Sequence, residues 1–337
     1  MVYIHVKKAG GKKYYTLRIS YRDKTGKIIT KDIENLGDNP SKIKFDALEK
    51  KYKKEIRQSY KVIKKFVESN YYLEKAQKKK IQESEFIGPE QLLEIEAIKI
   101  HFETIFSKLN LLTRQEIYAF FLIKFAVSST GIEGNTINME QASKLLAENI
   151  LPKDKTLREV YDLQNTKKAF FDLLEKKPPL TRETILLVHD ELLQNIDARK
   201  GYRTHDIHIL GQPFKPSPGR YVKADMELLL QWYNKHKNKI HPLALALFFH
   251  HKFENIHPFS DGNGRTGRLL LNLILLQHHY PPLIIPKALR EKYLQVMSAA
   301  DKGLQKSLFS LDMKSYQPLF LFVFTEFKKT YWNTFLV

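Results

Sequence analysis

Apolar residues recur with two different periods along the chain. Near the start, three short segments alternate apolar and polar residues or are rich in β-branched and aromatic residues, as is typical of strands: 2–6, 14–21 and 27–36. The turn-forming pairs Gly10-Gly11 and Thr25-Gly26 separate these segments. The pattern predicts a small three-stranded antiparallel sheet over residues 1–38.

The rest of the chain follows helical spacing. Residues 39–89 predict a basic helical segment and a linker, and the main domain is expected over residues 90–337. Within it the apolar positions and capping residues predict helices near 90–109, 113–130, 139–149, 155–176, 181–195, 222–238, 242–256, 265–279, 286–300 and 316–333. The exception is Gly201–Pro218, whose glycines, isoleucines and prolines predict a short hairpin and an extended loop. The fold class is therefore mainly α.

Composition narrows the class of protein. The 337 residues are 43% hydrophobic and 28% charged, which is typical of a folded globular chain. Cysteine is absent, which excludes disulfides, thiolate metal sites and a cysteine nucleophile. The most apolar runs, Leu269–Leu276 and Leu319–Phe324, are far shorter than the ~20 residues that span a bilayer. The start of the chain lacks the apolar core of a signal peptide, so we expect a cytoplasmic protein with no membrane partner.

Positive charge is concentrated in the first quarter of the chain. The formal net charge is +19, and residues 1–80 hold 23 Lys and Arg against 9 Asp and Glu. A segment this basic suits nucleic acid, an acidic protein or an acidic membrane surface. An ordinary solvated, lysine-rich surface explains the same composition. The sequence leaves these alternatives open.

The segment His257–Arg268 carries the clearest chemistry. It reads His-Pro-Phe-Ser-Asp-Gly-Asn-Gly-Arg-Thr-Gly-Arg, after one apolar helix and at the start of another. Glycines and a helix N-terminus form an anion site, and Asp261 is a hard oxygen ligand suited to Mg²⁺ beside a phosphate. Arg265 and Arg268, three residues apart, share a helix face and can neutralise phosphate oxygens. With His257 as a proton acceptor, the segment predicts phosphoryl or nucleotidyl transfer.

This segment resembles the signature of the Fic family, HxFx[D/E]GNGRxxR, and matches it at every defined position. The resemblance extends from about Phe120 to Ala300. It implies a Fic domain over residues 90–337, with an all-helical catalytic core at about 180–305 and a short β-hairpin flap. The substrates that it implies are ATP with Mg²⁺ and a target protein that bears a Ser, Thr or Tyr hydroxyl.

Residue by residue, the resemblance implies distinct roles in the site. His257 would deprotonate the attacking hydroxyl, and Asp261 would hold Mg²⁺ between the α- and β-phosphates. Arg265 would bind the β-phosphate region and Arg268 the γ-phosphate. Three residues would cradle the phosphates, chiefly through backbone amides: Gly262, Asn263 and Gly264.

Two further segments resemble parts of the family. The flap would align the target by strand addition and comprises Ile207, His208, Ile209, Leu210 and Gly211. Asp301 stands where many relatives have an asparagine near the adenosine, a departure that concerns the nucleobase rather than the phosphates.

An upstream motif resembles the inhibitory motif of the family, [S/T]xxxE[G/N]. Ser129, Glu133 and Gly134 occupy its defined positions, at the end of a helix expected over residues 113–134. The resemblance implies that Glu133 forms a bidentate ion pair with Arg268 and so keeps Arg268 from the γ-phosphate. The alternative is an ordinary helix end with Glu133 in solvent.

The leading hypothesis is a protein adenylyltransferase that moves AMP from ATP to a protein hydroxyl and is autoinhibited by Glu133. One alternative removes AMP from modified proteins with the same residues, Glu133 then positioning a water. Another transfers a different phosphate-containing group, and a third is a nucleic-acid-associated regulator that acts through residues 1–80. A monomer and a homo-oligomer are both compatible with the sequence.

Overall fold

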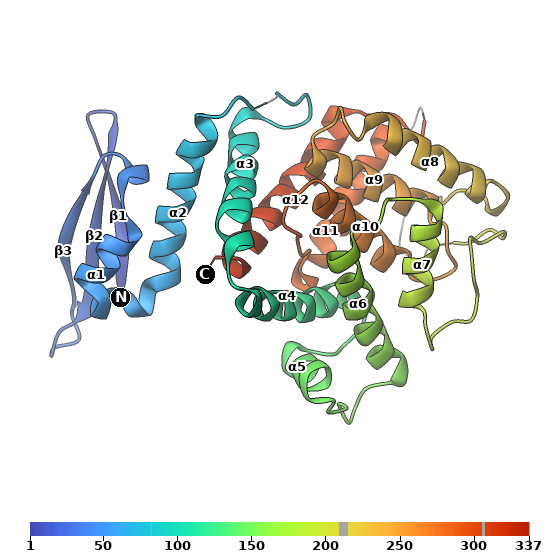
Figure 1. Cartoon of the computed structure of the whole chain (residues 1–337), viewed down its shortest axis with the longest axis horizontal. Helices are drawn as coiled ribbons and strands as arrows, with labels where there is room; N and C mark the ends of the chain where they lie inside the picture. Colours follow the sequence, from blue (N-terminus) through green and yellow to red (C-terminus); the bar gives the residue numbers. More distant parts are fainter. Residues whose placement is uncertain (82, 209–214, 305–306, 337) are drawn as a thin grey trace. The chain divides into compact units, whose positions relative to one another are not determined.

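The computed structural model describes residues 1–81, 83–208, 215–304 and 307–336. The chain divides into two compact units, both drawn in Figure 1. The first takes in residues 1–83, 89–108 and 335–337, and the second takes in residues 84–88 and 109–334. The predicted fold class, mainly helical with an N-terminal antiparallel sheet, is confirmed.

The first unit begins with the predicted three-stranded sheet. Its strands, antiparallel and adjacent in chain order, are β1 (Val2–Ala9), β2 (Lys12–Arg22) and β3 (Ile28–Gly37). Gly10 and Gly11, with φ of 56° and 75°, adopt the left-handed conformation that a tight hairpin turn requires. In the resulting register Ile4 lies opposite Leu17, so apolar side chains gather on one face.

Helices α1 (Phe45–Ile56) and α2 (Tyr60–Gln77) pack on that apolar face. The core of the contact contains Val2, Leu17, Phe45, Leu48, Ile63 and Val67. Helix α2 also packs against α3 (Pro89–Thr104). The residues that alternate with the core on the strands, among them Tyr3 and Arg18, are partly exposed. The sheet is therefore buried on one face only, as is common in small antiparallel sheets.

The second unit is helical in its regular structure over the described residues. Its helices are α4 (Leu111–Ile132), α5 (Met139–Glu148), α6 (Leu157–Lys176), α7 (Arg182–Leu192), α8 (Val222–His236), α9 (Pro242–Ile256), α10 (Asn263–Gln277), α11 (Arg290–Asp301) and α12 (Met313–Thr334). Asn138 and Thr156 form complete capping boxes at the starts of α5 and α6, which fixes those two helices where the sequence predicts them. In the described ranges, no helix combines the length and the apolar character that crossing a bilayer requires.

Helices α9 and α10 form the centre of the second unit. Both are buried along almost their whole length and pack closely on each other. A helix that is apolar on all sides needs neighbours on all sides, and α6, α7, α8 and α12 provide them. The loop from His257 to Gly262 joins the two helices, so the candidate chemistry is held between two buried, closely packed helices.

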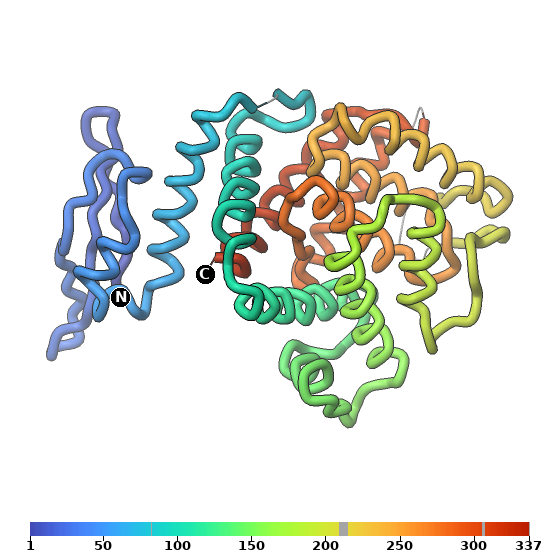
Figure 2. The backbone as a smooth tube through the Cα atoms, in the orientation of Figure 1, coloured from blue at the N-terminus to red at the C-terminus, as the bar shows by residue number. Residues whose placement is uncertain are grey.

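Between α7 and α8 the described residues 193–208 and 215–218 form no helix, and a short 3₁₀ turn over Gly219–Tyr221 leads into α8 (Figure 2). The predicted flap falls here. Ile207 and His208 have no strand structure. Ile209, Leu210 and Gly211 lie outside the described residues, so the flap hairpin stays a prediction.

Candidate active site

The loop between α9 and α10 is shaped by two left-handed residues. His257 ends α9 with φ of 52°, and Gly262 precedes α10 with φ of 77°. These two turns reverse the chain tightly and aim the N-terminus of α10 into the site. The first N–H groups of a helix lack partners within the helix, so those of Asn263, Gly264 and Arg265 can bind an anion.

The side chain of Asn263 braces the same loop. Its amide nitrogen donates to the carbonyl of Phe259 at 2.8 Å, and its amide oxygen accepts from the N–H of Phe259 at 2.9 Å. Asn263 is 2% exposed. Its side chain is thus committed to the loop, and its backbone is what remains for a phosphate.

His257 is held with one nitrogen occupied. Its Nδ1 lies 3.3 Å from the carbonyl of Glu254, and a proton on Nδ1 leaves Nε2 free to accept another. Burial lowers the pKa of His257 to about 4, so the imidazole is neutral at physiological pH. A neutral, oriented imidazole is the state that a general base requires.

Arg203 fixes the backbone around His257, a role that sequence reasoning missed. Its guanidinium donates to the carbonyls of His257, His205, Ser217 and Ile256 at 2.6–3.1 Å. Arg203 is only 4% exposed. Arg203 lies within Gly201–Pro218, where the sequence predicts a hairpin and a loop but indicates no role for this arginine.

Arg268 is surrounded by the residues of the upstream motif. Its Nη2 donates to Glu133 Oε1 at 2.8 Å and to the carbonyl of Ser129 at 2.9 Å, while its Nε donates to Ser129 Oγ at 2.9 Å. The pairing with Glu133 therefore uses one carboxylate oxygen and not the two of the expected bidentate pair, and Ser129 accepts from Nη2 and Nε. Gly134 follows with φ of 104°, where a side chain would be strained.

Gly264 allows this close approach. A Cβ built on Gly264 would lie 2.3 Å from Glu133 Oε1 and 2.9 Å from Arg268 Nη1. Gly264, to which the family resemblance gives a role in phosphate binding, therefore also leaves the space that the carboxylate of Glu133 occupies.

Arg265 and Asp261 form a second charged cluster. Arg265, 2% exposed, pairs with Asp162 of α6 and lies 3.2 Å from Asp261. Asp261 also pairs with Arg158, and although burial opposes it, the two arginines hold the pKa of Asp261 below its usual value. Sequence reasoning missed Arg158 and Asp162, which lie about a hundred residues from their partners.

A stacked pair of rings contacts this charged cluster. The ring of His189 lies parallel to that of Phe259, with centroids 3.6 Å apart, and its Nε2 is 3.0 Å from the carbonyl of Asp261. Burial lowers the pKa of His189, so the ring is neutral and stacks without a charge to solvate. His189 was not predicted either.

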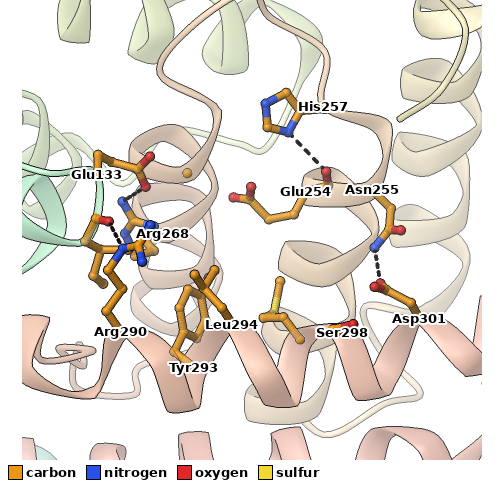
Figure 3. Close-up of a pocket in the computed structure, with 13 residues that line it drawn as sticks. Glu133, Glu254, Asn255, His257, Arg268, Arg290, Tyr293, Leu294, Ser298 and Asp301 are labelled. Carbon is orange, nitrogen blue, oxygen red and sulfur yellow. Dashed lines mark hydrogen bonds and ion pairs between the residues drawn. The ribbon is translucent and has the colours of Figure 1, made fainter. Parts of the chain in front are cut away.

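The structure brings His257, Gly264, Arg268 and Glu133 around one cavity of about 170 Å³ (Figure 3). Glu133 reaches toward Arg268 from one side, and His257 and Glu254 face it from the other. The remaining lining residues are Ile132, Asn255, Arg290, Tyr293, Leu294, Met297, Ser298 and Asp301. The cavity therefore joins an anion-binding end to a partly apolar end, a combination that suits a nucleotide.

Two further carboxyl groups line the cavity: that of Glu254, to which the sequence assigns no role, and that of Asp301. Burial raises the pKa of Glu254 to about 8, so this side chain is neutral at pH 7. Asp301 accepts from His251 Nε2 at 2.9 Å and from Asn255 Nδ2 at 3.1 Å. Asp301 is thus tied to α9, on the wall where the resemblance places the nucleobase.

Within the described residues, no group of three or more His, Asp or Glu side chains could hold a metal ion alone. A magnesium ion in this site would take Asp261 as its protein carboxylate and phosphate oxygens as further ligands, which is how Mg²⁺ commonly binds beside nucleotides. The charged carboxylate of Asp261 fits that requirement.

Comparison with known proteins agrees with the geometry. The profile of the Fic/DOC family matches residues 179–275, which contain the loop and α10. The protein adenylyltransferase Fic of Drosophila melanogaster is 35% identical over 185 residues, which are 52% of this chain and 36% of that protein. The protein of the same name from Drosophila persimilis gives the same identity over 35% of its length. The chain thus spans about a third of the length of these curated relatives.

Solved structures share the fold. A Fic domain containing signaling protein from Bacteroides thetaiotaomicron superposes with a TM-score of 0.64 at 21% identity, over 70% of this chain and 94% of that one. Fic-1 from C. elegans, residues 134–508, gives a TM-score of 0.61 at 23% identity, over 72% of this chain and 70% of that one.

Proposed function

The chain is a Fic/DOC family protein related to protein adenylyltransferases, and on that premise we propose that it transfers AMP from ATP to a hydroxyl group of a target protein. The observation that carries the proposal is the cavity in which a neutral His257 faces the N-terminus of α10 and the side chain of Arg268. A base, an anion site and a cation around one cavity are the parts that nucleotidyl transfer needs.

In the proposed reaction, Nε2 of His257 accepts the proton of a Ser, Thr or Tyr hydroxyl. The hydroxyl oxygen forms a bond to the α-phosphorus of ATP as the bond from that phosphorus to the bridging oxygen breaks, and pyrophosphate leaves. The backbone N–H groups of Asn263 and Gly264 would hold phosphate oxygens at the start of α10. The N–H of Gly262 donates to Asp261 Oδ1 at 2.6 Å and would join them once that contact is released.

Arg265 and Arg268 would bind different phosphates of the pyrophosphate leaving group. Arg265 is already oriented by Asp162 and Asp261, so it offers a fixed positive charge near the β-phosphate without first having to be ordered. Arg268 would take the γ-phosphate. When Mg²⁺ is bound, Asp261 would hold it, and the ion would neutralise phosphate charge.

The same arrangement supports autoinhibition in cis. The pairing of Glu133 with Arg268 occupies the guanidinium that the γ-phosphate would need. ATP can then enter only with its γ-phosphate displaced, which misplaces the α-phosphate relative to His257. We propose that Ser129, Glu133 and Gly134 act together as this restraint, since Ser129 orients Arg268 and Gly134 permits the turn that follows Glu133.

Transfer of label from ATP tests the proposal directly. Wild type, Glu133→Gly and Glu133→Gly/His257→Ala would each be incubated with Mg²⁺ and ATP labelled at the α-phosphate, alone and with a cell extract. Label that is weak with wild type, strong with Glu133→Gly and absent with the double variant supports transfer, restraint and base together. Glu148→Gly, also a glutamate at a helix end, is the matched control and should behave as wild type.

Other outcomes separate the alternatives. Label that is equally strong with wild type and Glu133→Gly contradicts the restraint and leaves the transferase. Absence of label with every variant contradicts AMP transfer. A protein that already carries AMP, and then donors with other phosphate-linked groups, would be the next substrates offered.

A further inference from the structure

The hairpin formed by β1 and β2 is the most uniformly basic element of the first unit. Residues 1–22 contain six Lys and Arg and no Asp or Glu. Four lysines surround its turn, Lys7, Lys8, Lys12 and Lys13, and are here called the hairpin tip. All four are exposed, and in the described part of the chain none of them forms an ion pair with a carboxylate.

The register of the hairpin places like charges against each other. Lys8 lies directly opposite Lys13, with Ala9 opposite Lys12 beyond them. Directly opposed residues in an antiparallel pair have Cβ atoms about 5 Å apart, and like charges there are destabilising. Residues 1–22 contain no carboxylate that could offset this repulsion. An anion bound between the ammonium groups of Lys8 and Lys13 would offset it.

The open face of the sheet, opposite to the face that Lys8 and Lys13 share with Ile4 and Leu17, is polar as well. On the face away from α1 and α2, Tyr3 lies opposite Arg18, His5 opposite Thr16, and Lys7 opposite Tyr14. These side chains are donors, acceptors and aromatic rings rather than aliphatic groups. One carboxylate faces them, Asp32, which pairs with Arg18 at 2.5 Å. The face is therefore polar and hydrogen-bonding, with positive charge concentrated at the tip.

We propose that this hairpin binds double-stranded DNA, with the hairpin tip on the phosphates and the open face of β2 directed into the major groove. Residues 7–14 form a two-stranded β-ribbon, because β3 pairs with β2 only from Tyr15 onward. The major groove of B-form DNA admits such a ribbon, and the deep, narrow major groove of A-form RNA does not. The tip reads Lys-Lys-Ala-Gly-Gly-Lys-Lys and contains no large apolar or aromatic residue with which to enter a bilayer. DNA is thus the polyanion that the shape and the charge fit together.

The size of the electrostatic contribution follows from the number of lysines. Each phosphate neutralised contributes about −0.9 to the slope of log affinity against log salt concentration. Four lysines on four phosphates give a slope of about −3.6. Affinity should then fall roughly 100-fold when salt rises fourfold, from about 50 to about 200 mM.

The test is fluorescence anisotropy of the full chain with a labelled duplex of about 20 base pairs, titrated over that salt range. The hairpin variant carries Lys7→Gln, Lys8→Gln, Lys12→Gln and Lys13→Gln. The control removes the same charge from exposed lysines of the second unit, with Lys223→Gln, Lys235→Gln, Lys237→Gln and Lys239→Gln. We expect the hairpin variant to lose the slope of about −3.6 and at least tenfold in affinity at low salt, and the control to stay within about twofold of wild type.

A double substitution separates binding from folding. Lys8→Gln/Lys13→Gln removes the opposed charges, so the melting temperature of the free protein should hold or rise while DNA affinity falls. Equal losses of affinity in the hairpin and control variants would overturn the proposal. So would absent binding by wild type, or binding as tight to double-stranded RNA or to anionic phospholipid vesicles. None of these outcomes depends on AMP transfer, which the hairpin variant should retain.

Discussion

Glu133→Gln should make the protein less stable and its site more active. The substitution keeps the size of the side chain and its place at the end of α4, but removes the charge that faces Arg268. Without ligand, Arg268 then keeps the two oxygens of Ser129 as partners but loses the opposite charge. With ATP present, the γ-phosphate meets no charged competitor. A loss of stability together with a gain in activity would distinguish a restraint from an ion pair that only stabilises the fold.

The exposure of Arg268 and Glu133 sets the size of the expected loss of stability. Removing one partner of a fully buried ion pair costs about 3–5 kcal/mol. Arg268 is 3% exposed, but the side chain of Glu133 is 42% exposed, and solvent already screens its charge. We therefore expect a loss of about 1–2 kcal/mol in the free energy of unfolding. For a unit of this size that lowers the melting temperature by about 2–4 °C per kcal/mol.

The affinity of Glu133→Gln for ATP should rise by the same free energy, because the γ-phosphate no longer has to displace a carboxylate from Arg268. A gain of about 1–2 kcal/mol corresponds to roughly 5- to 30-fold tighter binding in the competent pose. Thermal melts with and without ATP and Mg²⁺, run beside the transfer assay, measure both quantities, and Glu148→Gln is the control. If ATP raised the melting temperatures of wild type and Glu133→Gln equally, competition between Glu133 and the γ-phosphate would be refuted.

Four further substitutions or conditions test the rest of the site. Because burial lowers the pKa of His257 to about 4, transfer should be level through neutral pH and fall only as pH approaches that value, in a pH–rate profile of Glu133→Gln. The folded state keeps the proton of Glu254 up to about pH 8, whereas an unfolded chain releases it near 4.5, so wild type should lose stability relative to Glu254→Gln over that range, in melts of both proteins at the two ends. Arg203→Lys leaves buried carbonyls without a donor, so unfolding should ease by about 1–3 kcal/mol in denaturant titrations, with transfer impaired. Asp162→Asn removes a charge partner of Arg265 and should weaken ATP binding in calorimetry, while Asp172→Asn on the same helix should not.

The helices were predictable because their signals are local. Apolar spacing and capping residues predict a helix over residues 242–256, and α9 has those bounds. The differences lie at helix ends. Helix α10 begins at Asn263 rather than 265, because Gly262 in the left-handed conformation starts it earlier. Helix α11 begins at Arg290 rather than 286, because a short 3₁₀ turn over Lys287–Leu289 precedes it.

The site was predictable only where its residues are close in sequence or where the family pattern pairs them. His257 to Arg268 span twelve residues, and a motif of that length can be recognised without a fold. Asp162 lies 103 residues from Arg265, and nothing local to Asp162 indicates that it contacts a catalytic loop. The contact between Glu133 and Arg268 spans 135 residues and was expected only because of the family resemblance.

The bracing of Phe259 by Asn263 has a consequence for the timing of catalysis. The loop is closed by its own side chain, so its conformational entropy is lost when the chain folds and not when a nucleotide arrives. A preformed loop should capture ATP at a rate set by diffusion. The slow step of the proposed transfer would then be a movement of α4, whose last turn must carry Glu133 away from Arg268. A partner that displaced this one helix would set the rate of transfer without contacting a phosphate.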